Sequence, residues 1–180
     1  RTDMKLHLGC GEKKFKDFIN IDIREDVNPD VVDDISVLSE FKNESAELIY
    51  ACHVLEHFGR HEYLKVLRKW SEILKSEGTL RISVPDIGKV MEMYANGMSL
   101  RSLTGFLYGG QTYAENYHYI GFDYELLKED LENLGFKDIK KWDWKEVEHG
   151  HVDDYSQCYI PHMDKEDGEL MSLNIEATKI

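Results

Sequence analysis

A glycine turn joins the first two apolar segments of this chain and leaves little room for a helix between them. The segment "MKLHL" leads directly into Gly9, Cys10 and Gly11. The next apolar segment, "FINIDI", contains Asp22, only thirteen residues after Gly9. A dinucleotide-binding unit has a helix between its first two strands, with a pyrophosphate at the helix N-terminus and an acid about 20 residues further on. The shorter spacing predicts two strands joined without a full helix, and a ligand that has no phosphate at this turn.

Strand-like and helix-like segments alternate over residues 4 to 134, which predicts an α/β fold with a mostly parallel sheet and helices on both faces. Five short apolar runs are expected to be strands: "MKLHL", "FINIDI", "DVVDDI", "AELIYAC" and "TLRISVP". Residues 61–78 carry an apolar stripe at helical spacing and end at Gly78, so a helix there should cover the sheet. A second helix is expected over 122–136, capped by Asp123.

The C-terminal part has a different pattern, because two strand-like segments follow each other without a helix. Residues 137–144 and 169–180 are expected to pair antiparallel and to close the sheet as a hairpin. The connection 145–168 is an enlarged loop with one further strand expected around 155–160. The whole chain, 1–180, is therefore expected to be a single domain.

Residues 96–122 form the part of the chain that least resembles a scaffold. Several glycines interrupt this segment, and five of the ten tyrosines lie between Tyr108 and Tyr124. Tyrosines with glycine hinges can close over a planar or sugar-like molecule and exclude water. We therefore predict a substrate lid, although a fixed aromatic cover over the sheet would give the same pattern.

Composition limits the partners and the compartment. A formal net charge of −13 disfavours a polyanion, so neither nucleic acid nor a membrane surface is an expected partner. The three cysteines are widely spaced and include no C-x-x-C pair, which argues against a disulfide framework. No apolar run approaches membrane-spanning length, and no signal-peptide pattern is present. These features predict a cytoplasmic protein; they leave its oligomeric state open.

S-adenosylmethionine satisfies the restriction set by the glycine turn, because it ends in an amino acid and not in a pyrophosphate. Its ribose hydroxyls suit a carboxylate at the end of the neighbouring strand, and glycines let the backbone approach the methionine part closely. Gly9, Cys10, Gly11 and Asp22 supply this set. Lys13 or Lys14 would supply charge for the methionine carboxylate.

The order "LHLGCG", "NIDI", "DVVDDIS", "LIYACHVLEHF", "ILKSEGTLRISVPD" and "LENLGF" resembles the class I S-adenosylmethionine-dependent methyltransferases over nearly the whole chain. It is most similar to small bacterial members of the "HVLEH" type. The resemblance implies a Rossmann-like sheet and S-adenosylmethionine as cofactor. It also implies the cofactor site: Gly9, Cys10 and Gly11 under the methionine part, Asp22 at the ribose, Ile23, Asp34 and Ile35 at the adenine, and Cys52 and His53 on the opposite side.

The segment "HVLEHFGRH" brings several titratable residues to the end of the fourth strand, where open α/β sheets bind ligands. Glu56 and His57 resemble an acid/base pair of some methyltransferases with this fold. We predict that they are catalytic, with His118 of "ENYHYIGF" as the other candidate base. A purely structural role, in which Glu56 and His57 support the loop, is the alternative.

No metal site is expected. His53 and His57 are four residues apart, as in zinc metalloprotease helices, but Glu56 is out of H-E-x-x-H order and the sequence reveals no third ligand. The segment "HGHVDDYSQCYIPHMD" offers further histidines and aspartates whose spacing matches no known site. An acidic surface loop is the preferred interpretation of that segment.

The sequence thus predicts a methyltransferase that acts on a small molecule or a sugar or glycan acceptor. The family members with a reduced first helix and a tyrosine-rich lid suggest the sugar acceptor. Amino-methylating enzymes of this fold carry [N/D]-P-P-[Y/F] where this chain has "SVPD", which disfavours nucleic acid further. A regulatory module that binds the cofactor without transfer, and a nucleotide-cofactor oxidoreductase, remain as alternatives.

Overall fold

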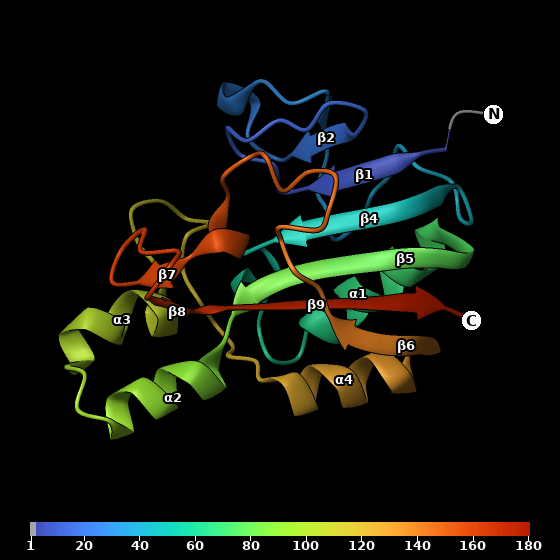
Figure 1. Ribbon diagram of the computed structural model, residues 1–180. Coiled ribbons are helices and arrows are strands. Elements are labelled where there is room, and N and C mark those ends of the chain that lie inside the picture. The colour runs from blue at the N-terminus through green and yellow to red at the C-terminus, as the bar shows by residue number, and fades with distance from the viewer. Residues whose placement is uncertain (1–2) are drawn as a thin grey trace.

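A seven-stranded sheet runs through the computed structural model, which describes residues 3–180 (Figure 1). Its strand order is β3-β2-β1-β4-β5-β9-β6. The first five strands in the chain pair in parallel, and β9 runs antiparallel between β5 and β6, so the predicted α/β class and C-terminal hairpin are confirmed. The strands are β1 (Lys5–Leu8), β2 (Ile19–Asp22), β3 (Val31–Val32), β4 (Ala46–Cys52), β5 (Leu74–Pro85), β6 (Phe136–Lys141) and β9 (Ser172–Lys179).

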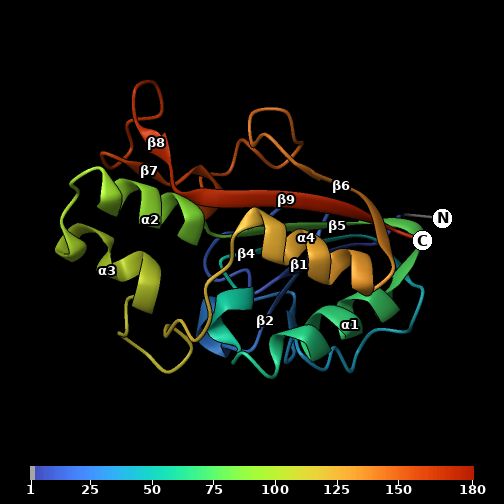
Figure 2. The same ribbon diagram turned by 90° about the horizontal axis from the view of Figure 1, so that it is seen from below.

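Helices α1 (Tyr63–Ile73) and α4 (Tyr124–Asn133) lie on the same side of the sheet (Figure 2). Their buried side chains, such as Trp70 and Leu127, join one core cluster with the sheet. The predicted helix over 61–78 is too long, because the chain leaves α1 at Ile73 and enters β5 directly. Leu74 is fully buried there and pairs with Ala46 of β4, so sheet pairing overrides the helical pattern.

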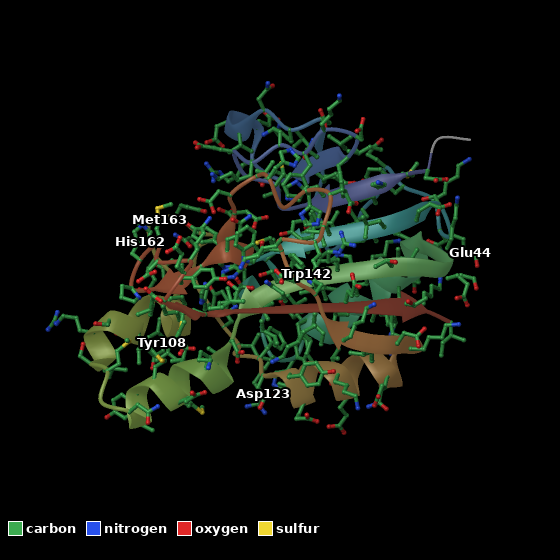
Figure 3. All side chains as sticks on the ribbon, viewed as in Figure 1. Glu44, Tyr108, Asp123, Trp142, His162 and Met163 are labelled. Carbon is green, nitrogen blue, oxygen red and sulfur yellow. The ribbon has the colours of Figure 1, made fainter. Side chains whose placement is uncertain are left out.

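The opposite face of the sheet has no helix in the described residues, which corrects the prediction of helices on both faces. Apart from β2, the chain between β1 and β3 forms only loops and the short 3-10 helix η1 (Glu25–Val27). An aromatic cluster covers this face instead: Phe15, Phe18, Leu48, Tyr50 and Trp142. The segment that follows β6 crosses in front of β4 and β5 in Figure 1, and Trp142 lies over the sheet in Figure 3.

Two further helices, α2 (Ile87–Ala95) and α3 (Leu100–Tyr108), extend beyond the carboxyl end of β5. They pack on each other and on Met171 through a small separate cluster. Helix α3 and the irregular segment 109–121 lie within residues 96–122, the predicted lid. No helix in residues 3–180 has the length and apolar character that crossing a membrane would need.

The connection between β6 and β9 is largely irregular. The strand expected around 155–160 is split into a 3-10 helix, η3 (Tyr155–Gln157), and a two-residue strand, β7 (Tyr159–Ile160), which pairs with β8 (Glu169–Leu170). Asp154 accounts for this break, because its carboxylate accepts hydrogen bonds from the Ser156 amide and starts a turn.

Asn20 of β2 stabilises the loop between β1 and β2, which takes the place of a first helix. Its Oδ1 accepts from the Phe15 amide at 2.9 Å, and its Nδ2 donates to the Phe15 carbonyl at 3.1 Å. The same Nδ2 donates to Asp30, and Asn20 is buried. One amide side chain therefore satisfies both backbone groups of Phe15, which a helix would otherwise satisfy through its own hydrogen bonds.

Replacement of this amide should destabilise the protein. Asn20→Ala leaves the buried amide and carbonyl of Phe15 without partners, so we expect the free energy of unfolding to fall by about 2–4 kcal/mol. Chemical denaturation measures this loss, with the exposed Asn43→Ala as the matched control. A loss in Asn20→Ala no larger than in the control would show that the loop does not depend on Asn20.

Candidate functional site

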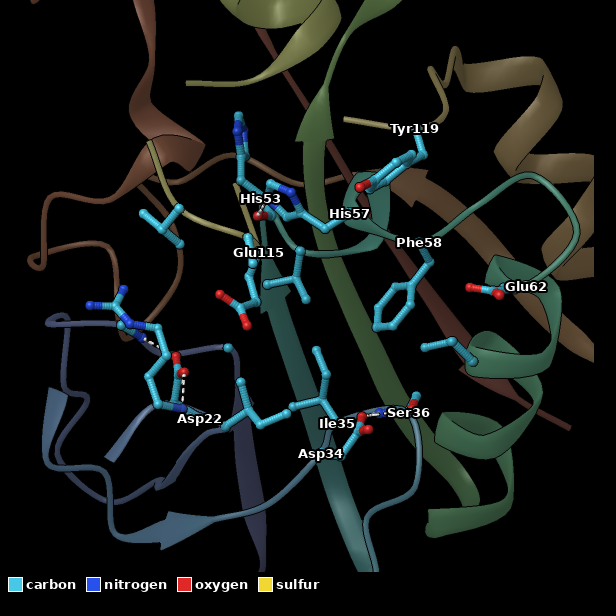
Figure 4. Close-up of a pocket in the computed structure, with 18 of the residues that line it drawn as sticks. Asp22, Asp34, Ile35, Ser36, His53, His57, Phe58, Glu62, Glu115 and Tyr119 are labelled. Atoms are coloured by element: carbon cyan, nitrogen blue, oxygen red, sulfur yellow. Dashed lines mark hydrogen bonds between the residues drawn. The ribbon is translucent and has the colours of Figure 1, made fainter. Parts of the chain in front are cut away.

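A pocket of about 800 Å³ opens at the carboxyl ends of the parallel strands, where open α/β sheets bind ligands. Asp22 and Asp34 lie at one end of this pocket, and His53, His57 and Tyr119 lie at the other (Figure 4). The strand ends, the start of α1 and the segment 109–121 all contribute to its walls. The lining residues are Gly9, Gly11, Asp22, Ile23, Arg24, Asp34, Ile35, Ser36, His53, Val54, His57, Phe58, Glu62, Lys65, Val66, Tyr113, Ala114, Glu115 and Tyr119.

The glycine turn forms the floor of the pocket and requires glycine for two reasons. Gly9 and Gly11 have positive φ angles of 63° and 52°, a region that other residues rarely adopt. In addition, a Cβ atom on Gly9 would lie 2.6 Å from the Val54 side chain. Lys14 does not line the pocket, because its Nζ donates to the carbonyl groups of Gly11 and Val27 and so holds the turn in place.

Asp22 links the glycine turn to the end of β2. Its Oδ2 accepts a hydrogen bond from the Gly11 amide at 2.8 Å, and its Oδ1 accepts one from the Arg24 amide at 2.9 Å. Both oxygens retain further lone pairs, and the residue still lines the pocket. Asp22 can therefore fix the turn and bind a pair of ligand hydroxyls at the same time.

The two neighbouring aspartates after β3 have different environments. Asp33 is buried and accepts hydrogen bonds from the Ser39 hydroxyl and the Glu40 amide, which gives it a structural role. Asp34 lines the pocket, and its Oδ1 accepts from the amide and the hydroxyl of Ser36. Its second oxygen, Oδ2, has no such bond among the described residues, which leaves an acceptor for a ligand donor.

Most of the predicted cofactor residues line the pocket, but two cysteines do not. Gly9, Gly11, Asp22, Ile23, Asp34, Ile35 and His53 are among the lining residues. Cys10 is buried, and its Sγ donates to the Gly11 carbonyl. Cys52 packs with Tyr50 on the opposite face of the sheet. Alternation of side chains along β4 explains this position, because residues 50 and 52 share a face.

The sequence prediction missed a group of lining residues that follow β4. Val54 and Phe58 come from the "HVLEHF" segment, and Glu62, Lys65 and Val66 come from the start of α1 and the residue before it. Their position could have predicted this role, because they directly follow a strand at the edge where open α/β sheets bind ligands. The prediction for this segment rested on its histidine and glutamate side chains, because these can transfer protons.

The segment 109–121 closes the pocket on the side away from the sheet. Tyr113, Ala114, Glu115 and Tyr119 face the cavity. The Arg24 guanidinium lies 4.8 Å from the centre of the Tyr113 ring, a cation–π contact between the end of β2 and this segment. The predicted lid segment thus contacts both ends of the pocket.

A buried carboxylate lies behind the pocket wall among three histidines. Glu56 is 1% exposed, and among the described residues neither of its carboxylate oxygens has a hydrogen-bond partner. Its Oε1 lies 3.7 Å from His57 Nε2, 3.9 Å from His53 Nδ1 and 3.9 Å from His118 Nε2. The three predicted catalytic residues, Glu56, His57 and His118, are therefore brought together, although 61 residues separate the two histidines in sequence.

Burial shifts the protonation of this cluster toward neutral forms. Desolvation raises the pKa of Glu56 to about 8 and lowers the pKa of His53 to about 3. Burial also lowers the pKa values of His57 and His118, although hydrogen bonds to backbone carbonyl groups oppose the shift. Such perturbed groups beside a cleft are typical of functional sites.

The histidines and aspartates of 149–162 are dispersed. His149 is buried between aromatic rings and accepts a hydrogen bond from Arg81, whereas His151 is exposed. Asp154 accepts from the Tyr50 hydroxyl and caps η3. Each of these side chains has a structural or surface role in the described chain, so they do not gather into a metal site.

The comparisons with known proteins agree with this geometry. Residues 13–82 match the family model described as a methyltransferase domain. No curated protein matches the chain in sequence.

Similar folds occur in three solved structures. A S-adenosylmethionine-dependent methyltransferase from Archaeoglobus fulgidus has 20% identity and a TM-score of 0.61, over 98% of this chain and 86% of that one. A possible histamine N-methyltransferase from Thermotoga maritima has 14% identity and a TM-score of 0.60, with 98% and 82% covered. A putative methyltransferase of the same cofactor class from Listeria monocytogenes has 16% identity and a TM-score of 0.59, with 100% and 92% covered. These structures confirm the predicted fold.

The raised pKa of Glu56 predicts a pH-dependent effect of Glu56→Gln. The unfolded chain releases this proton near the ordinary glutamate pKa of about 4.5, whereas the folded protein retains it up to about pH 8. The wild type therefore loses stability from this group as pH rises between these values. We expect Glu56→Gln to become progressively more stable than the wild type over that range. Denaturation at several pH values, with a chelator present, measures the difference; a constant difference would contradict the assignment.

Proposed function

We propose that this chain is a class I S-adenosylmethionine-dependent methyltransferase that transfers the cofactor's methyl group to a small-molecule or sugar acceptor; the family-model match and the similar folds support this. The pocket at the strand ends carries the proposal, because one continuous cavity offers a cofactor end and an acceptor end. The sulfonium already activates the methyl group, so the protein has mainly to hold a nucleophile in line with it.

At the cofactor end, the residues match the parts of S-adenosylmethionine in order. The methionine part lies over Gly9 and Gly11, whose lack of side chains permits a close approach. Asp22 accepts the two ribose hydroxyls. Ile23 packs against the adenine, and the unpaired oxygen of Asp34 accepts from the adenine amino group.

The charge of the pocket favours this cofactor over a dinucleotide. Four carboxylates line it, from Asp22, Asp34, Glu62 and Glu115, against two cationic side chains, Arg24 and Lys65. The sulfonium and ammonium groups of S-adenosylmethionine complement an acidic pocket, whereas a pyrophosphate would be repelled. Within residues 3–180, no helix lies between β1 and β2, so the glycine turn lacks the helix N-terminus that usually binds a phosphate there.

At the acceptor end, His57, Phe58, Glu115 and Tyr119 surround the space beyond the methionine part. Aromatic faces with hydroxyl and carboxylate groups between them suit a ring that carries several hydroxyl groups, as a sugar does. This end has no concentration of cationic side chains, and the net charge is −13, so a polyanionic nucleic acid fits poorly.

The cluster of Glu56, His57 and His118 is our proposed catalytic group. His57 lines the pocket, and Glu56 and His118 lie behind it. A hydroxyl acceptor must lose its proton during transfer, and this cluster is positioned to receive it. Hydrogen bonds from His57 to the Tyr117 carbonyl and from His118 to the Phe106 carbonyl fix the two rings.

Asp22→Asn should weaken cofactor binding by about 10- to 100-fold, because charge-assisted hydrogen bonds are worth about 1.5–3 kcal/mol each. Calorimetry with S-adenosylhomocysteine measures the effect. Asp17→Asn is the matched control, since it removes the same charge from an exposed position on the preceding loop. An unchanged dissociation constant in Asp22→Asn would show that the ribose lies elsewhere.

One experiment tests both the acceptor class and the catalytic cluster. It follows the transfer of a labelled methyl group from S-adenosylmethionine to a cell extract that is then fractionated. We expect label in the small-molecule or glycan fraction. Glu56→Gln, His57→Ala or His118→Ala should lower turnover by about 10²–10⁴-fold in at least one case, with little change in cofactor affinity. The exposed His61→Ala is the control.

Three other outcomes would contradict parts of this proposal. Label in nucleic acid would overturn the acceptor class. Tight cofactor binding without any transfer would favour a regulatory module. Near-normal turnover in all three variants would leave in-line positioning as the whole mechanism.

A further inference from the structure

We propose that Glu56, His57 and His118 bind a divalent transition-metal ion. One ligand atom from each of these residues lies within 4.8 Å of the other two. The carboxylate is almost completely buried and without a hydrogen-bond partner among the described residues. An ionised carboxylate buried without a donor is strongly unfavourable, so Glu56 either retains its proton or has a positive charge beside it. The tautomers of the three surrounding histidines show which ring nitrogens direct a lone pair toward the Glu56 carboxyl group.

His118 presents a lone pair to the carboxylate. Its Nδ1 lies 2.9 Å from the carbonyl oxygen of Phe106, and a carbonyl oxygen can only accept a hydrogen bond. The ring proton is therefore on Nδ1 in the neutral form. The other nitrogen, Nε2, carries no hydrogen and lies 3.9 Å from Glu56 Oε1. At this distance no hydrogen bond joins the two atoms, whether or not Glu56 retains its proton.

His57 differs from His118, because both of its ring nitrogens lie within hydrogen-bond distance of a carbonyl oxygen. Its Nδ1 donates to the Tyr117 carbonyl at 2.9 Å. In the neutral ring, Nε2 then has a lone pair, but it lies 3.0 Å from the carbonyl oxygen of His53 and 3.7 Å from Glu56 Oε1. Both neighbours are acceptors, so this contact also requires a cation or an additional proton.

His53 adds a third lone pair at the edge of the cluster. The Ser172 hydroxyl donates its proton to the Tyr155 carbonyl, so His53 Nε2 is the donor in its 2.9 Å contact with that hydroxyl. The Nδ1 atom of His53 is then unprotonated and lies 3.9 Å from Glu56 Oε1. The cluster as a whole consists of acceptors that converge on one point.

The distances favour a metal ion over a shared proton. A charge-assisted hydrogen bond between imidazolium and carboxylate would bring nitrogen and oxygen to about 2.7–2.9 Å. All three nitrogens instead lie 3.7 to 3.9 Å from the same oxygen. Ligands on a tetrahedral ion with bonds of about 2.0–2.2 Å are separated by about 3.3–3.6 Å. A small inward movement of the side chains would give that spacing.

The donor set identifies the class of ion. Two imidazole nitrogens and one carboxylate oxygen suit Zn²⁺, Fe²⁺ or Co²⁺, whereas Mg²⁺ and Ca²⁺ prefer oxygen ligands. The second nitrogen of each ring, in His57 and in His118, donates to a backbone carbonyl, which is the usual support for a metal-bound histidine. The third ligand that the sequence did not reveal is therefore His118.

Such an ion would hold the segment 109–121 to the end of β4. Glu56 and His57 belong to the 3-10 helix η2 (Leu55–His57), and His118 belongs to the segment that closes the pocket. The Tyr119 amide already donates to the Glu56 carbonyl, so the two segments are adjacent in the backbone as well. This inference does not depend on the proposed methyl transfer; with the ion bound, the three side chains act as ligands and not as the proton acceptor.

Cobalt provides a direct test on the full chain without an affinity tag, after chelator treatment and desalting. Titration with Co²⁺ should show one ion per chain, with visible d–d absorption of a low-symmetry site. We expect Glu56→Gln and His118→Ala each to weaken binding at least about 100-fold. His61→Ala and His151→Ala remove exposed histidines and should leave the affinity unchanged.

A second measurement separates metal binding from folding. Co²⁺ should raise the melting temperature of the wild type but not of Glu56→Gln. This variant replaces the buried carboxyl group with an uncharged amide of the same shape, so it should keep the wild-type circular dichroism and cofactor affinity. Wild-type Co²⁺ binding no tighter than that of Glu56→Gln would overturn the proposal and assign the missing charge to a proton on His57. Neither result depends on turnover, so failure of the methyl-transfer proposal would be recognised separately.

Discussion

The hydrogen bond from the Gly11 amide to Asp22 ties the end of β1 to the end of β2, and the geometry of the pocket depends on it. In a larger α/β protein, a helix between these strands would hold the turn and cover the sheet. This chain has a loop there, held by the Asn20 side chain and by Lys14. Side-chain hydrogen bonds to the backbone thus replace the hydrogen bonds of a helix, and the acid at the ligand site is also a structural residue.

The missing helix also determines what covers the other face of the sheet. Phe15 stacks between His7 and His149, with ring centroids 4.0 and 4.8 Å apart. Burial lowers the pKa of His7 to about 4 and that of His149 to about 3, so both rings are neutral and pack as apolar groups at neutral pH. The unfolded chain binds protons on these histidines below about pH 6.5. The contribution of the aromatic cluster to the free energy of unfolding therefore falls as the pH decreases from 6.5 toward 4.

The sequence was sufficient for the features that depend on local pattern. The mostly parallel sheet, the antiparallel hairpin and the cap at Asp123 follow from periodicity, turn residues and resemblance. It was insufficient where tertiary contacts decide between local alternatives. The helix predicted to reach Gly78 ends at Ile73, because Leu74 gains more from pairing in the sheet. Likewise, alternation along β4 turns Cys52 away from the pocket, although His53 beside it reaches the cavity.

The cluster of Glu56, His57 and His118 shows that the spatial grouping of residues cannot always be predicted from sequence, even when each residue is predicted to be functional. The sequence singled out His57 and His118 as competing bases, but their ring centroids lie 5.0 Å apart and both rings approach one carboxyl group. The segment that carries His118 reaches this point because its backbone binds Tyr108, Glu56 and His57. The same contacts that close the pocket therefore complete the cluster. Closure of the pocket and assembly of the cluster are two consequences of one arrangement, so a change in one should alter the other.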